Sequence, residues 1–441
     1  MLERKFATYL NDFLTSSPKK ILLVDGARQI GKSYIIRYVG SSMFKNFIEI
    51  DLRTDSDGER IFEKVRTTND FYLQLSILAG ERLGNVSNTL IFLDEIQVYP
   101  HLLTMLKFLN QEQRYRYIAS SSQLGIALSQ STSVPLGSIE IQHMYPLDFE
   151  EFLWSMNVGK EAIESIRQTF LQQRSLQEST HNYILKLFKY YLLTGGLPEA
   201  VSIFVESRNI KKMRQIQHSI YELYKIDASQ YDKQNSLKIR RIYDLIPSNL
   251  ENKKKRIVFK DIENKKGKQF KDYEDEFEYL IQSAVTLEVS AISNPHFPLI
   301  ESVTKNLIKL YLNDVGLLTS VLYNNNENAI LNNQRCISLG TVYESVVAQE
   351  LKAHGFKLHY YDNKQNGEVD FLINDYNTLS VLPIEVKSGK DYYVHSALNR
   401  FVSNDEYNIN KAIVFSDTNE ITQKGKIIYM PIYYIMFFSN L

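Results

Sequence analysis

Eight residues near the N-terminus have the types and spacing of a loop that binds a nucleoside triphosphate. They fit the pattern G-x-x-x-x-G-K-[ST], follow the apolar run KILLVDG and precede a segment of helical length, and they are Gly26, Ala27, Arg28, Gln29, Ile30, Gly31, Lys32 and Ser33. Glycines let the backbone N–H groups face phosphates, Lys32 adds a cation near the β and γ oxygens, and the Ser33 hydroxyl is suited to Mg²⁺. We therefore predict a site for ATP and Mg²⁺ at residues 26–34, with Tyr34 at its end and Lys32 as a catalytic residue. An ordinary glycine turn explains the strand–loop–helix context poorly.

A pair of acids supplies the second element that such a site needs. Residues 90–93 are apolar and lead directly into Asp94 and Glu95, as in a Walker B strand. We expect Asp94 to hold Mg²⁺ and Glu95 to act as the general base on the attacking water. A further strand ends in Ser120, Ser121 and Ser122, where a polar side chain would sense the γ-phosphate or simply form a serine-rich turn.

A second constellation lies near the C-terminus. Asp370 belongs to the run GEVDFLI, and Glu385 and Lys387 follow on the next apolar run, where strand alternation places both on one face. Asp370 and Glu385 would ligate a second Mg²⁺, Lys387 would orient water or neutralise charge, and Glu344 from the preceding helix would add a fourth group. Three alternatives stay open here, namely an active nuclease site, a nuclease-like binding module, and a set of solvated charges at strand ends.

The elements that must position these residues follow a simple pattern along the chain. Short apolar runs alternate with helical segments up to about residue 180, which predicts an α/β core with a parallel sheet covered on both faces. Residues 182–301 are predicted to be mostly helical, and a second α/β unit follows. Because 441 residues exceed one usual core, we expect three domains, with the bounds 1–180, 181–305 and 306–441.

Composition limits the class of protein. Lys plus Arg and Asp plus Glu both number 51, so affinity for nucleic acid has to come from local patches. The single Cys336 excludes an intramolecular disulfide and is expected to be a small buried residue. The N-terminal residues suggest an amphipathic helix rather than a signal peptide, and the apolar C-terminal stretch is too short for a membrane span, so we expect a cytoplasmic protein without a membrane partner.

One local patch is basic. Residues 238–271 contain 12 Lys or Arg against four Asp or Glu, including the consecutive Lys253, Lys254, Lys255 and Arg256. This segment would contact DNA phosphates or form a solvated loop. The helix after it has Tyr273, Phe277, Leu280, Ile281 and Ala284 on one stripe and acids on the other face, which would repel DNA. The eight histidines show no zinc-ligand spacing.

Four stretches give the chain a family resemblance over nearly its whole length. The sequences GARQIGKS, IFLDEIQ, YPLDFEEFL and LTGGLPEAV resemble those of prokaryotic AAA+ ATPases. That resemblance implies a P-loop AAA+ core, a helical, winged-helix-like middle region and a C-terminal domain similar to restriction endonucleases with the PD-(D/E)xK core. Gly137-Ser138 stands where the family has Gly-Arg, and Ala119-Ser120-Ser121 where it has Thr-Gly-Ser, so no arginine finger is identified.

Three functions compete at this stage. One is an ATPase whose nucleotide state controls a C-terminal domain that binds or cuts DNA. The second is a nucleotide-dependent switch or scaffold that binds a protein partner or forms a homo-oligomer without cutting anything. The third is a small-molecule kinase, which the Asp94-Glu95 pair and the multidomain length argue against.

Overall fold

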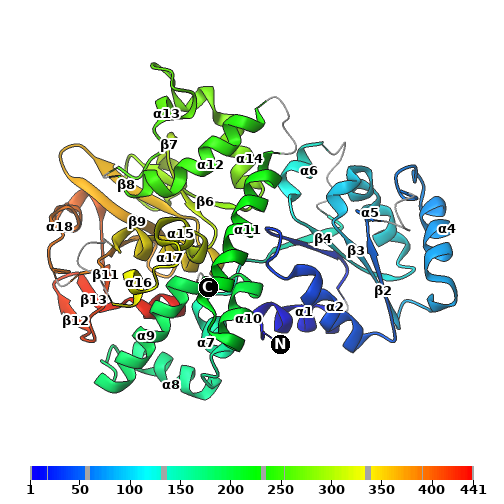
Figure 1. Cartoon of the computed structure of the whole chain (residues 1–441), viewed down its shortest axis with the longest axis horizontal. Helices are drawn as coiled ribbons and strands as arrows, with labels where there is room; N and C mark the ends of the chain where they lie inside the picture. The colour runs from blue at the N-terminus through cyan, green and yellow to red at the C-terminus, as the bar shows by residue number, and fades with distance from the viewer. Residues whose placement is uncertain are drawn as a thin grey trace. The chain divides into compact units, whose positions relative to one another are not determined.

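The computed structural model describes residues 2–16, 18–54, 60–130, 137–229, 235–252, 254–332, 339–389 and 391–439. Cys336 and Lys253 lie outside these ranges, so the predictions made for them are not addressed. The chain forms two compact units (Figure 1). The first contains Glu3–Tyr145 and Gln282–Ala284, and the second contains Pro146–Ile281 and Val285–Leu441. The three domains expected from the sequence stay a prediction.

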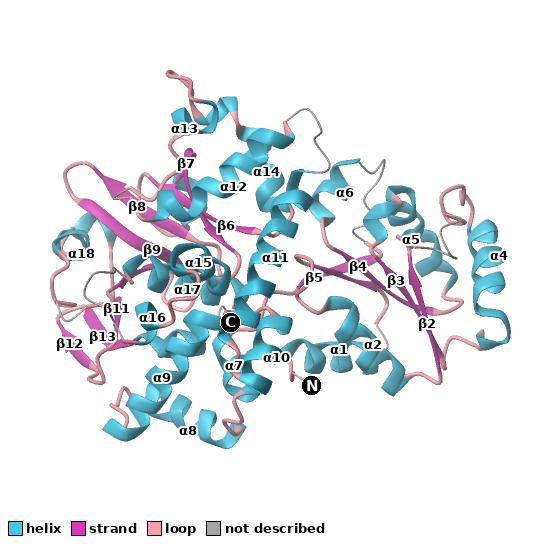
Figure 2. Ribbon diagram, viewed as in Figure 1, coloured by secondary structure: helices cyan, strands magenta, loops and turns pink. Residues whose placement is uncertain are grey.

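A five-stranded parallel sheet forms the centre of the first unit, in the order β2-β3-β4-β1-β5 (Figure 2). Its strands are β1 (Ile21–Asp25), β2 (Asn46–Asp51), β3 (Thr89–Asp94), β4 (Arg116–Ser121) and β5 (Ile139–His143). The first four were predicted from their apolar runs, and the parallel α/β core is confirmed. The strand β5 was missed, because only its first residue is fully buried.

Helices cover both faces of this sheet, as the alternation of buried side chains requires. One face packs on α4, α5 and α6 through a cluster that includes Leu23, Leu93 and Leu106. On the other face α2 contacts β2 and β3, and α1 packs on α2. These helices are α1 (Lys5–Thr15), α2 (Lys32–Met43), α4 (Thr68–Ala79), α5 (Pro100–Glu112) and α6 (Leu124–Gln130). The N-terminal amphipathic helix is thus confirmed as α1.

The second unit contains an eight-stranded mixed sheet in the order β12-β13-β11-β10-β9-β8-β6-β7. The strands β8, β9 and β10 are antiparallel, whereas β10, β11 and β13 run parallel. The strands are β6 (Thr286–Ile292), β7 (Val303–Leu312), β8 (His359–Asn363), β9 (Gly367–Asp375), β10 (Ser380–Val386), β11 (Ala412–Ser416), β12 (Thr422–Lys424) and β13 (Ile427–Pro431). Residues 182–301 were predicted to be mostly helical, so the strand β6, which pairs with β8 in parallel, was missed.

Helices make up the rest of the second unit. They are α7 (Phe149–Ser155), α8 (Lys160–Leu171), α9 (Glu178–Thr194), α10 (Pro198–Ser207), α11 (Ile210–Ser229), α12 (Ser236–Leu250), α13 (Phe259–Glu263), α14 (Glu274–Gln282), α15 (Val315–Tyr323), α16 (Asn328–Leu331), α17 (Gly340–Ala353) and α18 (Ser396–Val402). The predicted stripe on α14 is buried at Phe277 and Leu280. The apolar C-terminal stretch forms β13 and a buried 3₁₀ segment.

A buried polar hub explains the LTGGLPEAV sequence. Asp314, fully buried, accepts hydrogen bonds from the backbone N–H groups of Gly196 (2.6 Å) and Leu317 (3.1 Å). Gly195 has a φ of 69°, and a Cβ there would lie 2.1 Å from the Asp314 carboxylate, so only glycine fits. The buried Arg214 donates to the carbonyl oxygens of residues on α9 and α15. The hub therefore ties the loop after α9 to the start of α15.

Asp314 gives the stability of this unit a testable pH dependence. Burial raises the pKa of Asp314 to about 6, although the backbone hydrogen bonds oppose this shift. A carboxyl group with a raised pKa in the folded state stabilises the fold at low pH, and this contribution is lost as the pH rises through about 6. We expect the free energy of unfolding of the wild type, relative to Asp314→Asn, to fall by about 1–3 kcal/mol between pH 4 and pH 7.5. Urea unfolding at several pH values measures it, and parallel curves for the two proteins would contradict it.

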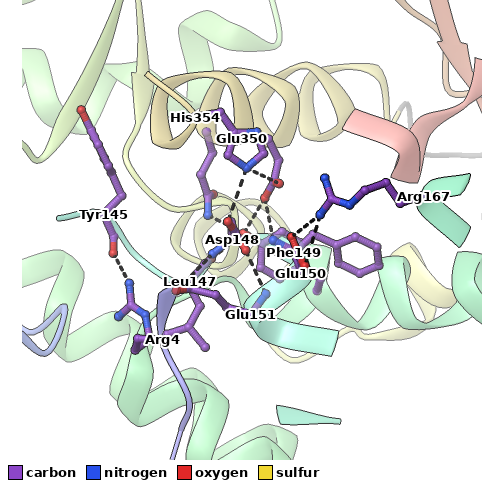
Figure 3. A network of polar contacts seen from close by, with 12 residues as sticks. Arg4, Tyr145, Leu147, Asp148, Phe149, Glu150, Glu151, Arg167, Glu350 and His354 are labelled. Atoms are coloured by element: carbon purple, nitrogen blue, oxygen red, sulfur yellow. Dashed lines mark hydrogen bonds and ion pairs between the residues drawn. The ribbon is translucent and has the colours of Figure 1, made fainter. Parts of the chain in front are cut away.

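A second polar network fixes the start of α7 (Figure 3). Asp148 caps this helix, accepting a hydrogen bond from the Glu151 N–H at 2.8 Å, while the Glu151 carboxylate accepts one from the Asp148 N–H. The N–H of Phe149 donates to Glu350 Oε1 of α17 at 2.9 Å, and the Tyr191 hydroxyl donates to the same oxygen at 3.0 Å. The sequence YPLDFEEFL thus anchors α7 on α17.

Candidate ATP site and carboxylate cluster

The loop between β1 and α2 has the backbone that its glycines predict. Gly26 and Gly31 have φ angles of 148° and 94°, and Gln29 also has a positive φ of 64°. A Cβ on Gly26 would lie 2.3 Å from the carbonyl oxygen of Met144, so no larger residue fits there. The loop therefore curls tightly at the carboxyl end of β1, where ligands bind in open parallel sheets.

Lys32 is buried in this loop. Its ammonium group donates to the carbonyl oxygens of Gly26 at 2.7 Å and Ala27 at 2.8 Å. Burial lowers the pKa of Lys32, although the negative charges of Glu95, Asp25 and Asp94 oppose the shift. The cation is thus held by its own loop and surrounded by acids.

The two acids after β3 have different surroundings. Asp94 accepts hydrogen bonds from the hydroxyls of Ser120 and Ser33. Burial raises the pKa of Asp94, although these two bonds and the charge of Lys32 oppose it. The contact between Asp94 and Ser33 joins the loop to the β3 end.

Glu95 has a left-handed backbone, with a φ of 60°, and its carboxylate has three partners. Its Oε2 lies 2.6 Å from Arg53, accepts a hydrogen bond from Ser122 at 2.9 Å and another from Gln97. Burial opposes ionisation of Glu95, but the charges of Lys32 and Arg53 outweigh it and hold its pKa below the usual value. Glu95 is therefore ionised at neutral pH.

The structure brings together most of the residues predicted for this site. Lys32, Ser33, Asp94 and Glu95 meet at the carboxyl edge of the sheet, and Ala27 and Ile30 are buried beneath the loop. Tyr34 is 52% exposed on the first turn of α2. The roles assigned to these residues and to Arg28 stay predictions.

Sequence reasoning missed two residues of the site. Arg53 follows the carboxyl end of β2, the strand next to β3, so its position in a parallel sheet was a usable signal. Gln97 lies two residues after Glu95, but a glutamine at this position does not by itself predict the contacts with Glu95 and Ser122. The serine strand end was predicted, and its hydroxyls indeed face the two acids.

The donor set at this edge suits Mg²⁺. The Asp94 carboxylate and the Ser33 hydroxyl are hard oxygen ligands of the kind that Mg²⁺ prefers, and they already touch. The buried Lys32 donates to the loop carbonyl oxygens of Gly26 and Ala27.

The carboxylate cluster predicted in the C-terminal region also forms. Glu344 lies on α17, Asp370 on β9 and Glu385 on β10, and all three are buried. The Val386 N–H donates to Asp370 Oδ2 at 2.9 Å, and Lys387 donates to Glu385 Oε1 at 2.7 Å. Burial, aided by the charge of Asp370, raises the pKa of Glu344 to about 7 and that of Glu385 to about 8, even though lysines oppose both shifts.

A lysine that was assigned to the basic patch completes this cluster. Lys255 forms an ion pair with Glu344 Oε1, and its side chain is only 19% exposed. The next residue, Arg256, pairs with Asp362 and is likewise 19% exposed. For these two residues the interpretation as a solvated loop was wrong, because their charges pair with acids inside the second unit. DNA contact by this segment stays a prediction.

As arranged, the cluster does not fit a divalent cation. In the described ranges, no group of three or more His, Cys, Asp or Glu side chains is arranged to hold a metal ion. Glu344 and Glu385 each give an oxygen to a lysine. A cavity of about 520 Å³ adjoins the cluster and is lined by Lys255, Glu344 and Lys387, among others.

The site of the first unit has the strand–loop–helix arrangement of a P-loop. Residues 18–153 match the model of an AAA domain family. Residues 185–328 and 339–435 match two domains of unknown function, DUF8612 and DUF4143. No curated protein matches the chain.

Among solved structures, the chain is similar to a Walker-type ATPase of Pyrococcus abyssi, with 12% identity, 73% of this chain and 96% of that chain covered, and a TM-score of 0.45. It is also similar to the Hsp104–ADP complex of S. cerevisiae, with 13% identity, coverages of 64% and 38%, and a TM-score of 0.29. PCH-2 of C. elegans shows 9% identity, coverages of 63% and 66%, and a TM-score of 0.24. Similarity at this level carries no information on substrates.

Throughout the described part of the chain, no helix is long and apolar enough to cross a membrane.

Proposed function

We propose that the first unit binds ATP with Mg²⁺ and hydrolyses it. The observation that carries this proposal is the convergence of Lys32, Asp94 and Glu95 at the carboxyl edge of the sheet, next to a loop with the backbone of a phosphate cradle. Lys32 would exchange its bonds to Gly26 and Ala27 for phosphate oxygens.

Each remaining residue has a role that follows from its contacts. Mg²⁺, when bound, neutralises charge on the phosphates, and Ser33 and Asp94 would hold it. Glu95 is ionised and would accept the proton of the attacking water, oriented by Ser122 and Gln97. Arg53 contacts Glu95 and would have to yield part of this contact when the water enters.

Phosphate release by the full chain tests this function. We expect steady turnover with ATP and Mg²⁺ that stops in excess EDTA. Binding of ATP without measurable turnover under any condition would remove hydrolysis and leave a nucleotide-dependent switch.

We further propose that the second unit is the output that the nucleotide state controls. A helix bearing Glu344, followed by Asp370, Glu385 and Lys387 on neighbouring strands, supports a domain similar to PD-(D/E)xK nucleases. The alternative is a switch or scaffold that engages a protein partner without cutting, and the lysines paired with Glu344 and Glu385 favour it. DNA contact, the winged-helix-like middle region and homo-oligomer formation stay predictions.

Strand breakage in the ATPase assay samples separates the two outputs. Turnover that rises with DNA, together with cleavage that disappears in Asp370→Ala, would support the nuclease. ATP turnover that DNA does not change, together with no DNA cleavage at any metal concentration, would support the switch.

A further inference from the structure

Lys255 reaches the carboxylate cluster from a distant part of the chain. It lies in the connection between α12 and α13, 89 residues before Glu344, whose Oε1 it contacts. Its N–H donates to the Asn252 carbonyl at 3.1 Å, and its φ of 50° is left-handed, which residues with a side chain rarely adopt. The Lys255 backbone thus adopts a strained conformation, and the Lys255 side chain contacts the carboxylate cluster.

The two lysines of the cluster differ in how they are attached. Lys387 follows Glu385 by two residues at the end of β10, so it cannot move far from that carboxylate. Both lysines line the cavity beside Glu344, but Lys255 belongs to a connection between helices and not to the end of a strand. Its ammonium group can therefore leave Glu344 for the cavity while the sheet stays intact.

Charge shows what the departure of Lys255 would change. Glu344, Asp370 and Glu385 are three buried acids, and Lys255 and Lys387 are the two lysines that pair with them. Three carboxylates close together repel one another unless cations compensate them. Without Lys255, Glu344 Oε1 would lose its lysine partner, while Oε2 would keep the hydrogen bond from the Tyr311 hydroxyl at 3.4 Å, and the cluster would lack one positive charge.

We propose that Lys255 is a built-in, displaceable cation that blocks divalent-metal binding to Glu344, Asp370 and Glu385. A divalent cation binds there only after the Lys255 ammonium group has left Glu344. Lys255 thus holds the second unit in a metal-free state. This inference rests on the proposed carboxylate site of the second unit and is independent of ATP hydrolysis.

Mn²⁺ binding to the full chain without nucleotide tests the proposal. We expect Lys255→Met to tighten Mn²⁺ binding at least about tenfold, because removal of an adjacent positive charge favours a cation. The gain should disappear when Asp370→Asn is added, which separates this site from the Asp94 site. Lys254→Met is the matched control, because Lys254 is the exposed neighbour, and it should bind Mn²⁺ as the wild type does.

A second measurement needs only the wild type and Asp370→Asn. Acetylation of lysines, read by mass spectrometry, should find Lys255 protected without metal and reactive once Mn²⁺ fills the Asp370-dependent site. It decides the matter even if Lys255→Met does not fold.

Three results would overturn the inference. They are unchanged or weaker Mn²⁺ binding by folded Lys255→Met, a gain that persists when Asp370→Asn is added, and a Lys255 that stays protected from acetylation at saturating Mn²⁺. The absence of Asp370-dependent Mn²⁺ binding would overturn it as well. Displacement of Lys255 by Mn²⁺ without strand cleavage would uphold the inference while the nuclease function failed.

Discussion

Replacing Lys32 by alanine is expected to reduce ATP turnover by more than about 100-fold and to weaken ATP binding. Lys32 is the buried cation of the loop, and its ammonium group lies among Glu95, Asp25 and Asp94. Its removal takes away the buried positive charge that lies among these acids and would meet the phosphates. Phosphate release and binding of a fluorescent ATP analogue measure the two effects.

The matched control is Lys45→Ala, which removes an exposed lysine from the same unit. Turnover and binding should equal those of the wild type in this variant. If Lys32→Ala keeps turnover within about threefold of the wild type, the loop is not the catalytic phosphate site.

Replacing Glu95 by glutamine should separate binding from hydrolysis. The amide keeps the size of the side chain and the hydrogen bond from Ser122, but it cannot take up the proton of the attacking water. We expect turnover to fall by about 10²–10³-fold while ATP stays bound, because general base catalysis contributes effects of this size. Single-turnover hydrolysis and analogue binding, measured together, test both halves of this prediction.

Glu81→Gln, an exposed acid of the same unit, serves as the control for Glu95. A Glu95→Gln protein that hydrolyses ATP like this control would show that another group activates the water. Loss of analogue binding in Glu95→Gln would instead assign Glu95 to nucleotide binding.

The sequence predicted elements well where local pattern decides the structure. The apolar runs of β1 and β3 are buried throughout, and both strands pair in parallel with β4 between them, which brings the loop, Asp94 and Glu95 to one edge. Strand β5 is short and only its first residue is buried, and β6 follows a long helical region, and both strands were missed.

The two candidate sites depended on contacts that no local pattern encodes. Arg53 reaches Glu95 because two strands are neighbours in space, and Lys255 reaches Glu344 across 89 residues of chain. A charged run read from sequence alone looks solvated, because burial depends on the partner that tertiary structure supplies. Lys255 and Arg256 were interpreted as part of a solvated loop for this reason.

The helix α17 has a mechanical consequence for the second unit. It holds Glu350, which receives the first N–H of α7, and Glu344, which belongs to the carboxylate cluster. Six residues separate the two acids, a rise of roughly 9 Å along one rod. A helix transmits axial displacement with little loss, so a pull on the start of α7 would shift Glu344 against Lys255. In this respect α17 couples the YPLDFEEFL segment mechanically to the acids of the carboxylate cluster.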